Sequence, residues 1–128
     1  MVVDVCESMK QILDAAGYTA SLKRLDSFTG KEGIVLRRVL PQRTERYFDN
    51  GRSYDFIVHV VVRRRSEAQA MYECSDIAEL LTDCPVESLN GSYTWTGTDI
   101  YTEPEEMALD EDNFYAWNTR VNVRIERS

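Results

Sequence analysis

The chain lacks the residue patterns of common catalytic and metal sites. It has one histidine, His59, and three cysteines, Cys6, Cys74 and Cys84, among 128 residues. The cysteines show no CxxC spacing and leave one thiol over in any pairing scheme, which argues against a zinc knuckle and a disulfide framework. No phosphate-cradling glycine loop and no nucleophile elbow occurs. We therefore expect reduced thiols, no cofactor, no metal and no enzymatic activity.

Long apolar runs are also absent. No stretch approaches the roughly 20 apolar residues that a membrane-spanning helix needs, and the N-terminus does not combine a basic leader, an apolar run and a cleavage site. A chain of 128 residues with 43% hydrophobic residues fits one globular unit. We expect residues 1–128 to form a single domain that is soluble, is not exported and makes no membrane contact.

Basic residues are missing from a long part of the chain. Between Ser66 and Phe114 there are thirteen Asp and Glu residues and no Lys or Arg, whereas Arg37 to Arg65 holds eight arginines against three acids. The net charge of −7 argues against general nucleic-acid binding, although the arginine density alone is typical of a phosphate-binding stripe. Two interpretations remain. The basic and acidic residues either intermix on the surface of the folded chain, or they form separate patches that contact the oppositely charged patch of a neighbouring copy.

Hydrophobic periodicity predicts two helices and several strands. Apolar residues at spacings of three and four predict a helix over residues 2–16 that ends at Gly17, which accepts the left-handed conformation. A second helix is predicted over residues 66–84, because Ser66 and Gln69 form a capping box. Strands are predicted at residues 18–25, 34–40, 44–48, 52–64, 92–101 and 114–127.

The clearest strand signal is a hairpin whose turn is Asp49-Asn50-Gly51. On its second arm the even residues from Phe56 to Val62 are all apolar, whereas the odd face is mixed and needs partial cover from a subunit or from another part of the chain. Runs of strands with isolated helices indicate an α+β fold, in which two helices pack on one face of a mainly antiparallel sheet with a long β-hairpin. We expect four residues to be buried together: Ile12, Val60, Ile77 and Val123.

The acidic stretch Tyr101–Trp117 is predicted to be the connection between the last two strands. It lacks the central Gly and the downstream Glu of a calcium loop, and clustered ionised acids on a loop are poorly suited to acid–base catalysis. Our interpretation is a solvated loop that serves as a docking surface. His59 lies within a strand and is expected to be hydrogen-bonded and partly buried, and Cys74 is expected to be a core residue.

The order of these elements resembles that of the minor capsid and tail terminator proteins of tailed bacteriophages. The quoted matches are the first helix ending near Gly17, a strand ending at Leu40-Pro41, the hairpin RYFDNGRSYDFIVHVVVRR, the helix SEAQAMYECSDIAELL and the C-terminal strand pair. The resemblance implies a structural protein without catalytic residues. It further implies that the protein forms a ring, usually six-fold, that caps the tail tube and joins the head connector.

The resemblance also implies where the protein acts and what it contacts. The expected location is the tail–head junction of the virion, after assembly in the bacterial host cytoplasm. The expected partners are further copies of the chain, the tail tube protein and the head connector protein. We expect no sequence-specific nucleic-acid binding.

We predict that residues of both charged segments form the interface with another copy or with a partner protein. The residues are Arg43, Arg46, Tyr47, Arg52, Arg63, Arg64 and Arg65 on the basic side, and Glu103, Glu105, Glu106, Asp110, Glu111 and Asp112 on the acidic side. Two alternatives remain open: a monomeric α+β domain that binds a small ligand or regulates, and a small enzyme that uses His59 with a carboxylate. The size of the protein in solution separates the ring from both.

Overall fold

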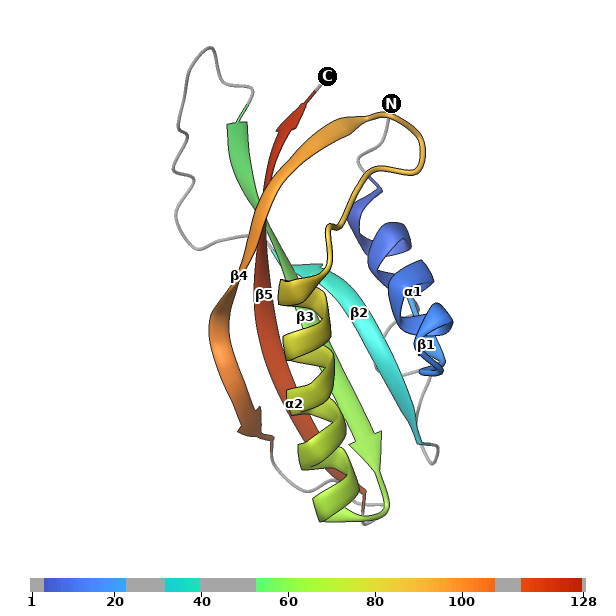
Figure 1. The fold of residues 1–128 in the computed structure, drawn as a ribbon. Coiled ribbons are helices and arrows are strands. Elements are labelled where there is room, and N and C mark those ends of the chain that lie inside the picture. The colour runs from blue at the N-terminus through green and yellow to red at the C-terminus, as the bar shows by residue number, and fades with distance from the viewer. Residues whose placement is uncertain (1–3, 23–31, 40–52, 108–113, 128) are drawn as a thin grey trace.

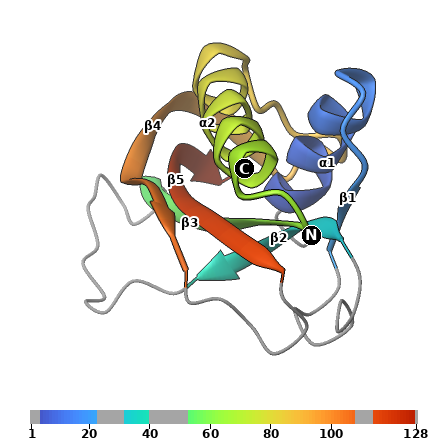
Figure 2. The same ribbon diagram turned by 90° about the horizontal axis from the view of Figure 1, so that it is seen from below.

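The computed structural model describes residues 4–22, 32–39, 53–107 and 114–127, and within them it shows an α+β fold. Helices α1 (Val5–Ala15) and α2 (Glu67–Asp83) both pack on one face of a single sheet (Figures 1 and 2). The predicted fold class is therefore confirmed. The strands are β1 (Ala20–Ser21), β2 (Gly33–Val39), β3 (Ser53–Arg64), β4 (Tyr93–Glu106) and β5 (Tyr115–Arg127).

The strand order of the sheet is β1-β2-β3-β5-β4. The central strand β3 is antiparallel to β2 and β5, β4 is antiparallel to β5, and β1 is parallel to β2. The sequence of β3 is a nearly continuous apolar run, which suits a strand that has neighbouring strands on both sides. The predicted first hairpin arm, residues 44–48, and its turn lie outside the described residues. On that side of β3, the structure pairs residues 57–63 with β2.

The core lies between the two helices and the sheet. Val60, Ile77 and Val123 are completely buried, as predicted. The prediction was wrong for Ile12, which is only partly buried at the margin of the core. The side of α1 that faces the core carries Val5, Met9 and Leu13, and Ile12 lies beside this row. The main contributors are Val5, Met9 and Leu13 from α1, Cys74, Ile77 and Leu81 from α2, and Phe56, Val58, Val60, Val62, Val121, Val123 and Ile125 from β3 and β5.

Local signals set the ends of both helices. Gly17 follows α1 with φ of 97°, the left-handed conformation expected there. At the start of α2, Ser66 Oγ accepts a hydrogen bond from the Gln69 amide at 3.3 Å. The other half of the predicted capping box does not form, because the Gln69 side chain donates to Glu73 Oε2 at 2.8 Å. Cys84 then adopts an extended conformation and ends the helix.

The second face of the sheet is also largely buried. Val35 and Val61 are cross-strand neighbours on this face, and Ile57 lies four residues before Val61 on the same strand. These three residues, Val35, Ile57 and Val61, are 1%, 4% and 4% exposed. The isolated chain buries them, so their cover needs no second copy. Of the two predicted sources of cover, another part of the chain is sufficient for these three residues.

The start of α1 is tied to the loop that precedes β4. The Asp4 carboxylate accepts hydrogen bonds from the amides of Leu89 and Asn90 at 2.8 and 3.1 Å. It also accepts from the hydroxyls of Ser88 and Ser92 at 2.7 and 3.2 Å. Burial alone would raise the pKa of Asp4, but the hydrogen bonds to its carboxylate outweigh burial and hold the pKa below its ordinary value.

Candidate interaction surface

Part of the predicted acidic loop is strand. Glu103, Glu105 and Glu106 belong to β4, whose pairing with β5 continues to Glu106, so the strand end predicted at Tyr101 was wrong. The reason is the partner strand: the Asn118 side chain donates to the Glu105 carbonyl at 3.2 Å, and the pairing is regained after each irregularity. The other three predicted acids, Asp110, Glu111 and Asp112, lie outside the described residues.

The edge strand β4 exposes carboxylate side chains, and its backbone does not offer a regular row of hydrogen-bonding groups to a further strand. Its register with β5 shifts at three places in the described sheet, between Trp95 and Gly97, between Ile100 and Thr102, and between Thr102 and Glu105. Pro104 lies within the third shift and has no N–H to donate. Bulges, proline and charge on an edge strand all oppose pairing with a foreign strand. A partner of this edge is therefore expected to recognise its side chains.

Three carboxylates on β4 have no partner among the residues that the structure describes. Glu103, Glu105 and Glu106 are exposed, and within the described part of the chain none of their side chains makes a hydrogen bond or an ion pair. Asp99 on the same strand differs, because it accepts from Arg124 at 3.0 Å. The three glutamates are the available acidic groups of this edge.

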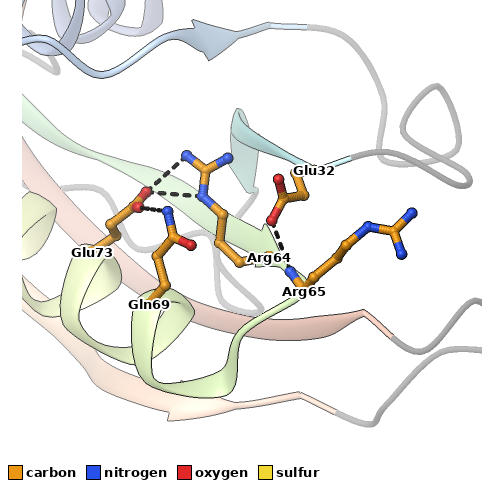
Figure 3. A network of polar contacts seen from close by, with 5 residues as sticks. All are labelled: Glu32, Arg64, Arg65, Gln69 and Glu73. Atoms are coloured by element: carbon orange, nitrogen blue, oxygen red, sulfur yellow. Dashed lines mark hydrogen bonds and ion pairs between the residues drawn. The ribbon is translucent and has the colours of Figure 1, made fainter.

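Arg64, by contrast, is engaged within the chain. Its Nε and Nη2 donate to Glu73 Oε1 at 3.0 and 2.8 Å, and Gln69 holds the other Glu73 oxygen (Figure 3). The side chains of Arg64 and Glu73 are only 19% and 17% exposed. This contact joins the end of β3 to the first turns of α2, so Arg64 already has an internal role.

The two neighbours of Arg64 also have internal contacts. The guanidinium carbons of Arg63 and Arg65 lie 4.4 and 4.8 Å from the centre of the buried Phe114 ring, which is within the range of cation–π attraction. The Arg65 amide donates to Glu32 at 2.8 Å (Figure 3). The remaining predicted basic-side residues, Arg43, Arg46, Tyr47 and Arg52, lie outside the described residues.

A row of basic side chains that sequence reasoning missed crosses the sheet opposite the helices. Arg37 on β2, His59 on β3 and Arg120 on β5 are direct cross-strand neighbours. Arg37 is exposed, and the other two are half-buried. In the described residues, neither arginine makes an ion pair or a hydrogen bond through its side chain. We call Arg37, His59 and Arg120 the basic row.

His59 is neutral within this row. Its Nε2–H donates to Asn118 Oδ1 at 3.0 Å, in agreement with the predicted hydrogen-bonded, partly buried histidine. Burial has the largest effect and lowers the pKa of His59. The hydrogen bond to Asn118 opposes this, Arg120 and Arg37 lower the pKa further, and Glu105 raises it with the smallest effect. The pKa therefore lies below its ordinary value of 6.5, and the imidazole is uncharged at pH 7.

Burial disfavours the thiolate form of Cys6 and Cys74. Burial raises the pKa of Cys74 to about 12, as expected of a core residue. The pKa of Cys6 is also raised to about 12, mainly by burial and further by Glu7. The described residues contain no group of three or more His, Cys, Asp and Glu side chains that could hold a metal ion. None of the described helices is both long and apolar enough to cross a bilayer.

Comparison with known proteins gives no assignment. No protein-family model matches the chain, and no curated protein matches it.

Proposed function

We propose that this chain is a structural protein of a tailed-bacteriophage virion, the tail terminator. In this role it forms a ring, six-fold by the resemblance, that caps the tail tube and joins the head connector at the tail–head junction. The proposal assigns no catalytic step to the chain. The described helices and strands follow the order on which the resemblance rests, and that order supports the proposal.

The observation that carries the proposal is the presence of two different charged surfaces on one copy. Glutamates that have no side-chain partner among the described residues lie on the edge strand β4. The arginines of the basic row, which likewise have none there, lie on the face of β2 and β5 opposite the helices. A head-to-tail contact needs two distinct, complementary patches on each copy, and it closes into a ring when the rotation per subunit permits. A two-fold dimer would instead use one self-complementary patch.

The size of the protein in solution is the first test. Sedimentation velocity over a wide concentration range should show a single closed oligomer growing at the expense of the monomer, and negative-stain images should show rings. A two-fold dimer, or a monomer that binds a small ligand, would contradict the ring.

The second test concerns the tail tube. We expect the genes beside the coding sequence to encode portal, head-completion and tail tube proteins. Purified tubes of that tail tube protein should bind the chain at their ends only, and the bound chain should stop further elongation. Neighbouring genes of unrelated function, or binding along the sides of the tube, would contradict the assignment as terminator even if a ring forms.

A further inference from the structure

The basic row holds two arginines that lack an anionic partner among the described residues. Arg37 and Arg120 each lie directly opposite His59 across a strand pairing. Neither guanidinium meets a carboxylate in the described residues. Both groups are therefore available to an anionic partner.

The arginine run at the end of β3 is a poorer candidate for the same contact. Arg64 is bound to Glu73, and Arg63 and Arg65 lie against the Phe114 ring. Recruiting this run for a partner would break contacts that join β3 to α2 and to Phe114. Binding a partner through Arg37 and Arg120 would break no hydrogen bond or ion pair of their side chains among the described residues.

The acidic edge of a second copy complements the basic row in charge. Arg37 and Arg120 are separated by two strand spacings, which is about 9.6 Å at roughly 4.8 Å per spacing. Glu105 lies opposite Asn118 and Glu106 opposite Trp117, so these two neighbouring carboxylates leave β4 on opposite faces of the sheet. Arginine binds carboxylates through a planar fork of donors, so Arg37 and Arg120 can each hold one glutamate of the edge.

We propose that Glu103, Glu105 and Glu106 of one copy dock on Arg37 and Arg120 of the next, so that the basic row and the β4 edge are the two halves of the head-to-tail contact. This inference rests on the proposed ring and replaces the Arg63–Arg65 run as its basic half. Because the β4 backbone is irregular, side-chain ion pairs carry the contact. The acidic edge lies on β4 and the basic row runs across β2, β3 and β5, so each copy carries both halves. Glu105 is the edge acid that acts electrostatically on His59 of its own copy.

Charge reversal on each half gives a decisive test. The first variant is Arg37→Glu/Arg120→Glu, and the second is Glu103→Arg/Glu105→Arg/Glu106→Arg. Alone, each variant places like charges at every contact and should assemble at least tenfold more weakly than the wild type. Mixed in equal amounts, the two variants satisfy every contact by alternation, and the mixture should form rings that contain both chains in equal number.

The matched control is Lys10→Glu/Arg124→Glu. It makes the same change in net charge as the first variant but lies outside the basic row. The Lys10–Asp14 and Arg124–Asp99 ion pairs that it breaks are both exposed. This control should assemble like the wild type. Circular dichroism checks the fold of each variant. If Arg120→Glu impairs folding, the single change Arg37→Glu, at an exposed position, should still weaken assembly several-fold.

The outcomes separate the two proposals. A wild-type chain that stays monomeric at every concentration overturns the ring and the docking contact together. Wild-type rings that form equally well from the Arg37→Glu/Arg120→Glu variant overturn the contact and leave the ring standing. A mixture of two folded variants that stays dispersed also overturns the contact. Binding of short double-stranded DNA that depends on Arg37 and Arg120, with assembly unchanged, would assign the basic row to a polyanion instead.

Discussion

Asp4 holds together two segments that are more than 80 residues apart in the chain. Its carboxylate accepts hydrogen bonds from the amides of Leu89 and Asn90 and from the hydroxyls of Ser88 and Ser92. Because the folded pKa is held below the unfolded value, the ionised form stabilises the fold. This contribution is fully present above the unfolded pKa and is lost as the pH falls through the folded pKa.

Replacing Asp4 with Asn should lower the free energy of unfolding at pH 7 by about 1–3 kcal/mol, because two backbone amides and two hydroxyl groups lose a charged acceptor. As the pH falls from 7 through the folded pKa of Asp4, the variant should also lose less stability than the wild type. Urea unfolding across this pH range measures both effects. The control is Glu7→Gln, which removes one exposed carboxylate from the same helix. Equal acid sensitivity in the wild type and Asp4→Asn would contradict the role of this carboxylate.

Among the contacts between elements, the Arg64–Glu73 pair joins β3 to α2 (Figure 3). We expect a double-mutant cycle with Arg64→Met and Glu73→Gln to give a coupling energy of about 1 kcal/mol, because two guanidinium N–H groups donate to one Glu73 oxygen and the pair is mostly shielded from water. The same cycle on Lys10–Asp14, an exposed pair within α1, should give a much smaller coupling. Thermal or urea unfolding supplies the free energies. Equal coupling in the two pairs would show that shielding does not strengthen the Arg64 contact.

Local chemistry made the helices predictable, and tertiary pairing limited the prediction of strands. Gly17 and Ser66 mark helix ends by their own backbone and side-chain preferences, and both signals were correct. The end of β4 was missed because Glu103, Pro104 and Glu105 all have low strand propensity. Pairing with β5 outweighs that local preference. The same limit applies to β1, whose two residues form a strand only through β2.

The charged surfaces were predictable in part. The acidic content of residues 66–114 indicated a docking surface, and Glu103, Glu105 and Glu106 are indeed exposed. The basic row was not predictable, because Arg37 and Arg120 are far apart in sequence and become neighbours of His59 only through the order β2-β3-β5. Arg64 was assigned to a partner because its internal acceptor, Glu73, lies across a turn that periodicity alone does not orient.

For the whole molecule, we expect assembly to depend more on where the charges lie than on the net charge. We expect assembly to weaken as salt rises from about 0.1 M to 1 M, because the screening length falls from roughly 10 Å to 3 Å. Sedimentation at several salt concentrations measures the change, and monomer stability at each salt is the control. Assembly that strengthens with salt would indicate an apolar contact, for which exposed Tyr72, Leu89 and Tyr101 are the candidates.

The irregular register of β4 has a consequence for the protein at high concentration. Long, flat edge strands template the stacking of sheets into amyloid-like fibres. Here the strand at one edge is broken by three register shifts, and the strand at the other edge, β1, has only two residues. Neither described edge strand offers a straight template, so a crowded solution of this chain is expected to hold discrete particles that disperse on dilution.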